Sequence, residues 1–230
     1  MSGYLIINIL IILFPLLLSF ETKIKYYRKF PEIVKSILAT GIIFIIWDIL
    51  AVKRGDWSFN KEYVSGLNIF SLPFEEVLFF ITVPYSILFI YEVVRYYAED
   101  RPVNISIHII LIASLVCAVI AVLNYERHYT FTVFIVFSSI LFISYIIMPL
   151  FILSKNFLVT LVISLLPFFI VNYILTALPV VEYNPKAIMG IRILTIPVED
   201  LFYSLSMISS WLLIYKLCEK TKPAIIMKND

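Results

Sequence analysis

Charge, glycine and cysteine are all scarce in this sequence, and each scarcity excludes a class of protein. Charged residues make up 15% of the 230 residues, whereas a soluble domain usually carries about 25%. Hydrophobic residues reach 62% and the net charge is only +2. A chain this apolar cannot bury its surplus in one water-facing domain, which excludes a soluble enzyme and a disordered tail. So small a net charge gives no reason to expect a nucleic-acid partner. The composition predicts an integral membrane protein in contact with the lipid bilayer.

Metal ligands and nucleotide-binding motifs are also in short supply. Cys117 and Cys218 are too few for a disulfide framework or a cysteine zinc cluster. His108 and His128 are too few for the several histidine ligands of a membrane iron oxygenase. The five glycines never approach the G-x-G-x-x-G pattern of a dinucleotide site. The sequence therefore predicts neither a metal nor a bound cofactor.

Long apolar runs dominate what is present. A bilayer core needs about 20 apolar residues per helix, and seven segments approach this length. The first carries no basic leader and no small-residue cleavage site, which favours a retained helix over a cleaved signal peptide. The predicted fold class is all-α, a polytopic membrane bundle of seven transmembrane helices. The expected spans are Gly3–Phe20, Ser36–Val52, Phe74–Val94, Asn104–Leu123, Thr130–Leu153, Phe157–Leu178 and Pro197–Tyr215.

Lysine and arginine set the expected orientation, because cytoplasmic loops carry an excess of them. We expect a multi-pass protein of the cell membrane with its N-terminus outside and its C-terminus in the cytoplasm. The predicted cytoplasmic side holds Lys23, Lys25, Arg28, Lys29, Lys35, Arg95, Arg101, Lys155, Lys216, Lys220, Lys222 and Lys228. The other side holds half as many cations, namely Lys53, Arg54, Lys61, Arg127, Lys186 and Arg192.

The sequence also contains an internal repeat, in which residues 60–80 resemble residues 184–204 at a constant offset of 124 positions. Shared leucine content does not produce matched proline, glycine, asparagine and acidic residues at one offset. Four crossings separate equivalent points, so the two repeats should run in the same direction. We expect a first repeat over residues 1–95, a linker helix within 96–129 and a second repeat over 130–230. The identical pairs are Asn60/Asn184, Gly66/Gly190, Ile69/Ile193, Pro73/Pro197 and Glu75/Glu199.

Two acidic pairs lie where polar side chains would enter the membrane. Each pair follows a proline by one residue and opens an apolar helix. Ionisable residues at membrane depth are costly, which makes them candidates for function. The parallel repeats would gather six polar groups in one layer of the outer half of the bilayer. These groups are Glu75, Glu76, Glu199, Asp200, Asp48 and Asn172.

Helix capping is the alternative explanation for these acids. Proline is favoured at a helix start, and a carboxylate there meets the positive end of the helix dipole. Capping does not account for two repeated pairs with a further acid in a neighbouring helix. Successive residues point about 100° apart around a helix. We therefore expect one member of each pair to face the bundle interior and the other to pack or hydrogen-bond nearby.

Aromatic residues accompany the acids. Phe79 and Tyr203 follow their acidic pairs by three or four positions, which places each ring on the carboxylate side of its helix. Aromatic faces stabilise cations, and a carboxyl group shielded from water can stay protonated and act as an acid. This combination suits the formation and guidance of a carbocation in an apolar substrate. The aromatic candidates are Trp47, Phe79, Phe80, Phe202 and Tyr203.

These motifs resemble those of the small integral-membrane lycopene β-cyclases of carotenoid synthesis. The similarity covers nearly the whole chain, as in the fused form of the two-subunit bacterial enzymes and in the cyclase domain of the bifunctional fungal protein. The family pattern of Pro, any residue, Glu, Glu or Asp and then aromatics is met twice. The matching segments are Pro73–Glu76 with Phe79 and Phe80, Pro197–Asp200 with Phe202 and Tyr203, Trp47–Asp48, Trp57–Asn60, Phe89–Glu92, and Asn184 with Gly190–Arg192.

The resemblance implies an isomerase, or intramolecular lyase, that uses no cofactor. Its reaction would be the redox-neutral acid–base cyclisation of the acyclic ends of lycopene to β-rings, giving γ-carotene and β-carotene. Lycopene would be the lipophilic partner, and the resemblance also implies an association with other enzymes of carotenoid synthesis. Acid and base would come from Glu75, Glu76, Glu199 and Asp200, with Asp48 orienting or relaying, and individual roles stay open. Trp47, Phe79, Phe80, Asn172, Phe202 and Tyr203 would contact the substrate.

A proton-coupled membrane transporter is the alternative function. Intramembrane acids and internal repeats also serve proton relays in transporters. Two features argue against this alternative: the acidic pairs lie near helix starts, and no span is broken by paired glycine and proline.

Overall fold

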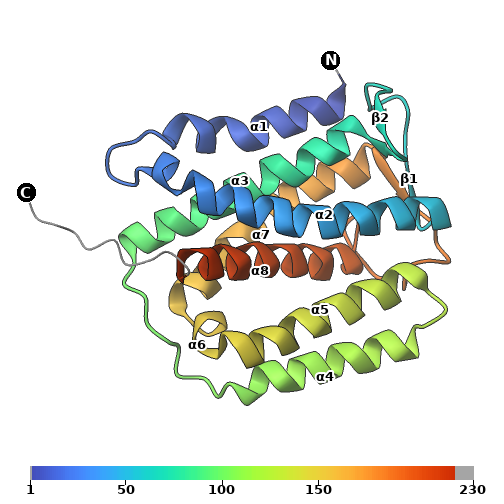
Figure 1. The fold of residues 1–230 in the computed structure, drawn as a ribbon. Coiled ribbons are helices and arrows are strands. Elements are labelled where there is room, and N and C mark those ends of the chain that lie inside the picture. The colour runs from blue at the N-terminus through green and yellow to red at the C-terminus, as the bar shows by residue number, and fades with distance from the viewer. Residues whose placement is uncertain (1, 221–230) are drawn as a thin grey trace, which may run out of the picture.

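A computed structural model describes residues 2–220 of the chain (Figure 1). This part is mostly helical, as the sequence predicted. A short 3-10 helix, η1, covers Tyr26–Lys29. Within residues 2–220 the α-helices are α1 Gly3–Leu18, α2 Phe30–Arg54, α3 Phe74–Tyr97, α4 His108–Leu123, α5 His128–Ile147, α6 Pro149–Ile152, α7 Lys155–Ala177 and α8 Val198–Lys220.

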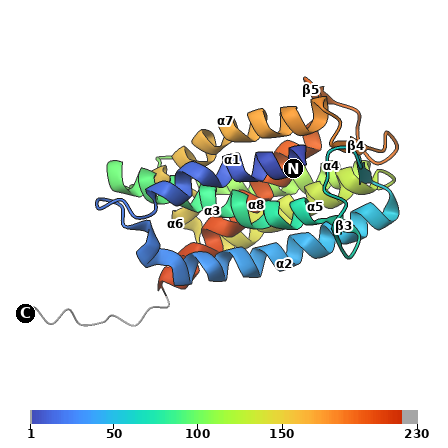
Figure 2. The same cartoon turned by 90° about the horizontal axis from the view of Figure 1, so that it is seen from above.

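The long helices lie roughly parallel or antiparallel to one another in a single bundle (Figures 1 and 2). Within residues 2–220, five helical segments are long and apolar enough to cross a membrane: η1 with α2, and α3, α5, α7 and α8. Helices α1 and α4 are also apolar but have 16 residues each, slightly below the usual length of a span. Five spans therefore satisfy length and composition, and the expectation of seven stays a prediction.

The start of the fourth predicted span at Asn104 is wrong. Helix α4 begins at His108 because the preceding segment is tied to another part of the chain. The Val103 N–H donates to the Leu153 carbonyl at 2.9 Å, and the Lys155 N–H donates to the Arg101 carbonyl at 2.9 Å. Backbone groups used in this way are not available for a helical turn.

The fifth predicted span also ends too late. Helix α5 stops at Ile147, and the short helix α6 begins with Pro149. A proline disfavours the helical conformation of the residue before it, and Met148 has φ −141° and ψ 54°. The break predicted at Ser154–Asn156, between the fifth and sixth spans, ends earlier than expected. Helix α7 already begins at Lys155, because Ser154 caps it by accepting from the Phe157 N–H.

Two β-hairpins, equivalent in sequence, precede α3 and α8. Strands β2 (Asn68–Ile69) and β3 (Leu72–Pro73) pair before α3, and β5 (Arg192–Ile193) and β6 (Ile196–Pro197) pair before α8. Their tips share an uncommon conformation, with φ 56° at Phe70. The corresponding value is 57° at Leu194, which lies 124 positions later. The hairpins therefore repeat the offset found in the sequence.

A third strand pair joins the two halves of the chain. Strand β1 (Trp57–Phe59) pairs antiparallel with β4 (Val181–Tyr183). At its centre Ser58 faces Glu182, and these two positions are themselves 124 residues apart. Each strand thus pairs with its own counterpart, which is the register that a local two-fold axis produces.

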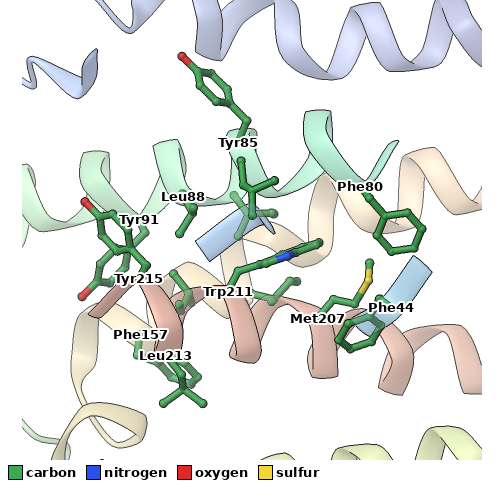
Figure 3. Close-up of a cluster of buried hydrophobic side chains, with 14 of the residues drawn as sticks. Phe44, Phe80, Tyr85, Leu88, Tyr91, Phe157, Met207, Trp211, Leu213 and Tyr215 are labelled. Atoms are coloured by element: carbon green, nitrogen blue, oxygen red, sulfur yellow. The ribbon is translucent and has the colours of Figure 1, made fainter. Parts of the chain in front are cut away.

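The apolar core runs between α3 and α8, with α2 and α7 beside them. Trp211 is fully buried at the centre of this cluster, between Leu88 of α3 and residues of α8 (Figure 3). At one end of the cluster, Tyr91 and Tyr215 meet edge to face with ring centroids 6.1 Å apart. Packing of this kind fixes α3 against α8, the two helices that begin with the acidic pairs.

A network of charges lies at the end of the bundle where α3 and α8 finish. Glu219 binds Lys29 at 2.9 Å and Arg95 at 2.8 Å, and Arg95 also binds Glu92 at 2.6 Å. These cations belong to the side predicted to face the cytoplasm. Of the other cations used in that prediction, Lys222 and Lys228 lie outside the described residues.

Candidate functional site

The first acid of each pair anchors the loop before its own helix. Glu75 Oε1 accepts from the Ser65 N–H at 2.6 Å and from the Ser2 hydroxyl at 2.5 Å. In the second half, Glu199 Oε1 accepts from the Met189 N–H at 2.6 Å, and from the hydroxyl of a threonine at the start of α5 at 2.6 Å. Both glutamates are fully buried. Each glutamate thereby ties the loop before its helix to the first turn of that helix.

Glu199→Ala is therefore expected to lower stability. The substitution leaves the Met189 N–H without its acceptor, and an unsatisfied buried donor costs about 1–3 kcal/mol. Thermal unfolding of the purified protein in detergent measures the effect as a lower midpoint. Glu182→Ala, on the exposed face of β4, is the matched control and should leave the midpoint unchanged. Equal midpoints for the two variants would contradict the anchoring role.

The second acid of each pair points elsewhere and meets tyrosine hydroxyls. Tyr4 of α1 donates to Glu76 Oε2 at 2.6 Å. Asp200 receives two such bonds, from Tyr129 of α5 at 2.7 Å and from Tyr183 of β4 at 2.8 Å. These contacts hold both carboxyl groups in fixed orientations.

Asp48 of α2 completes a group of three carboxyl side chains. Tyr203 donates to Asp48 Oδ1 at 2.8 Å, and the carboxyl groups of Asp48 and Glu76 interact directly. All three acids, Asp48, Glu76 and Asp200, are at least nine-tenths buried. Residues 2–220 contain no group of three or more His, Cys, Asp or Glu side chains that could hold a metal ion.

These three carboxyl groups open onto one cavity of about 420 Å³, a volume typical of small-molecule sites. Its walls come mainly from α1, α3, α7 and α8. The three acids are the only charged residues among the lining residues described, and most of the remainder are aliphatic or aromatic. The cavity therefore combines an apolar interior with proton-carrying groups.

The structure divides the predicted substrate-contact residues into two sets. Phe79, Asn172 and Tyr203 line the cavity. The other three are not among its lining residues. Trp47 packs on Tyr203 with ring centroids 4.8 Å apart, Phe202 packs on rings of α5, and Phe80 is buried in the main core.

Several aromatic residues that line the cavity were not predicted as site residues, and four of them lie close to the acids. Tyr4, Tyr129 and Tyr183 bind the acids, and Trp57 packs on Tyr129 at 4.9 Å. Tyr183 is outside the helices, and burial together with the nearby Asp200 raises its pKa well above the usual value. The signal available in the sequence was the position of Tyr4 and Tyr129 at the starts of corresponding helices.

The two halves of the chain differ in the size of a side chain that borders the cavity. In the first half Trp47 fills the space beside Tyr203. The residue 124 positions after Trp47 is Val171 of α7, which lines the cavity. The residue 124 positions before Tyr203 is Phe79, which also lines it. A small side chain replaces a large one there, and the space beside Phe79 stays open.

The comparison with protein families identifies a matching family. A family model described as lycopene cyclase matches residues 2–94 and residues 126–218. Residue 126 follows residue 2 by 124 positions, and residue 218 follows residue 94 by the same number. No curated protein and no solved structure matches the chain. The two matched segments together cover most of the chain and contain all three carboxyl residues of the cavity.

Proposed function

Because the chain belongs to the lycopene cyclase family, we propose that it is a lycopene β-cyclase that acts on acyclic carotenoid ends inside this cavity. Membership of the family implies an enzyme with a carotenoid substrate, and the specific reaction below is our proposal. It would convert lycopene through γ-carotene to β-carotene as an isomerase, without net oxidation. The observation that carries the proposal is the placement of Asp48, Glu76 and Asp200 in an otherwise apolar cavity.

The proposed reaction starts from a proton held between Asp48 and Glu76. Two adjacent carboxyl groups share a proton more readily than they carry two negative charges. This proton adds to the terminal double bond of the acyclic end group and leaves a tertiary carbocation. The next double bond along the chain attacks the cation, forms one carbon–carbon bond and closes the six-membered ring. The positive charge then lies on a ring carbon.

Asp200 is the proposed base that completes the reaction. Hydrogen bonds from Tyr129 and Tyr183 favour the charged form of its carboxylate. It removes a proton from the ring carbon next to the cation, which creates the ring double bond. One proton enters and one leaves, so the product is an isomer of the substrate. The aromatic rings of Trp57, Phe79 and Tyr203 would stabilise the cation while the apolar walls exclude water.

We also propose that seven helices cross the membrane as two parallel repeats, residues 1–95 and 130–230, joined by a linker helix within 96–129. Three features support this. The two hairpins occupy equivalent positions in the two halves, and strand β1 pairs with its equivalent, β4, so that Ser58 faces Glu182. The carboxyl groups of Glu76 and Asp200 also lie near the starts of equivalent helices, α3 and α8. The acid end of the bundle would face outward, and the Glu219 network would lie on the cytoplasmic side. Helices α1 and α4 would then span a thinned region or continue through their flanking loops.

Production in cells that accumulate lycopene tests the proposed function. We expect the pigment to shift from lycopene to monocyclic and bicyclic products of the same mass, separated by chromatography. Cells that carry the empty vector give the baseline. A proton-coupled transporter would leave the pigment as lycopene, and unchanged lycopene with the protein present in the membrane would contradict the proposal.

A further inference from the structure

The cavity is elongated along the helix axes, although the proposed reaction involves only one end group of the substrate. Lining residues recur every three or four positions along α3, from Glu76 to Ile90, and along α8, from Asp200 to Trp211. At about 1.5 Å per residue, these stretches measure roughly 21 and 16 Å. The cavity is therefore a groove that runs parallel to the helices.

The two ends of this groove differ in chemistry. The carboxyl groups lie at the end where α1, α3 and α8 begin. The opposite end is lined by Pro15, Ile90, Ser164 and Trp211, with no charged residue among the lining residues described there. A ligand in the groove would therefore meet acids at one end and apolar walls along the rest of its length.

The groove also has an opening on one side. Among the lining residues described, only Leu10, Pro167 and Ile170 are exposed. Leu10 belongs to α1 and is 62% exposed, and Ile170 belongs to α7 and is 53% exposed. Helices α1 and α7 run side by side along one face of the bundle (Figure 2). Their outer surfaces are apolar, so in a membrane this opening faces lipid and not water.

We propose that the gap between α1 and α7, bordered by Leu10, Pro167 and Ile170, is a lateral entrance through which a linear polyene passes from the bilayer into the groove. The inference rests on the proposed function and adds the route and orientation of the substrate. One end group reaches Asp48, Glu76 and Asp200 while the conjugated chain lies along the groove. A stiff conjugated chain cannot fold back to bring its second end to the same acids. Each binding event therefore cyclises one end, and the monocyclic product leaves by the same entrance.

A pair of bulky substitutions tests the entrance. The protein that carries both Leu10→Trp and Ile170→Trp is placed in vesicles containing lycopene, and the initial rate of ring formation is measured. We expect a fall of about tenfold or more, because the two indole rings would narrow the opening and raise the free-energy barrier to substrate entry. The control carries Leu17→Trp and Leu166→Trp on the same two helices. Both control residues are exposed and lie outside the groove lining, so its rate should stay near that of the unsubstituted protein.

The outcomes separate the entrance from the proposed function. An unchanged rate in the entrance variant would overturn the entrance, and so would an equal fall in the entrance and control variants. The single substitutions Leu10→Trp and Ile170→Trp decide the matter if the double variant does not fold, since each should slow the reaction without lowering the unfolding midpoint. Failure of the unsubstituted protein to form rings would instead contradict the proposed function.

Discussion

The Asp200→Asn protein is expected to fold and insert normally and to form almost no rings from lycopene. Asparagine keeps the size of the side chain and can still accept the hydrogen bond from Tyr129 or Tyr183. It cannot take up the proton that must leave the ring. Loss of a general acid or base typically costs about a hundred- to ten-thousandfold in rate. Glu76→Gln should have an effect of the same order, because it removes the proposed proton source beside Asp48.

Initial rates in lycopene-containing vesicles measure this effect. The unfolding midpoint and the amount of protein in the membrane show whether folding is intact. Glu182→Gln, on an exposed side chain of β4, is the matched control and should keep the full rate. Undiminished ring formation in both Asp200→Asn and Glu76→Gln would contradict the assignment of acid and base.

The Val171→Trp protein is expected to lose activity for a different reason, because its cavity is filled. The equivalent position in the first half holds Trp47, whose ring lies 4.8 Å from Tyr203. By the same geometry the introduced indole would lie against Phe79 and occupy the space of the substrate. We expect a loss of about a hundredfold or more in rate, since the bulk competes directly with binding, while overpacking costs only about 1–3 kcal/mol in stability.

Val162→Trp is the matched control for this substitution. Val162 lies on the same helix, is 67% exposed and is not part of the cavity lining. It should leave the rate unchanged. Val171→Phe should give an intermediate rate, which keeps the test decisive if the tryptophan variant is unstable. Full activity in Val171→Trp would show that the reaction does not take place in this cavity.

The sequence predicted the acidic pairs and their helices well, because proline and adjacent carboxylates mark a helix start directly. It did not decide which member of each pair faces inward. Residues one position apart differ by about 100°. Hydrogen bonds from the Ser65 and Met189 N–H groups, which precede the hairpins, and from two side-chain hydroxyls direct Glu75 and Glu199 toward the loops. Glu76 and Asp200 are thereby left to face the cavity.

The partners of the acids were harder to predict. Tyr129 and Asp200 are 71 positions apart in the chain, and the pairing depends on how α5 packs against α8. The side of the bundle that holds the cavity depends on Val171 where the first half has Trp47. A difference between two apolar residues carries no signal until the repeats are superimposed in space.

The predicted helix boundaries were wrong where the composition of the chain was followed too closely. The stretch before His108 is apolar enough to be helical, but the backbone of Arg101 and Val103 is bonded to Lys155 and Leu153 instead of to a helical turn. The end of α5 could have been placed correctly from Pro149 alone, since the residue before proline avoids the helical conformation.

An experimental structure of the Asp200→Asn protein with lycopene bound tests the central claim most directly. The account predicts the polyene along the groove between α1, α3, α7 and α8, with one acyclic end group in contact with Glu76 and the substituted side chain. An end group bound elsewhere on the protein, with the cavity of Asp48, Glu76 and Asp200 filled by water, would contradict it.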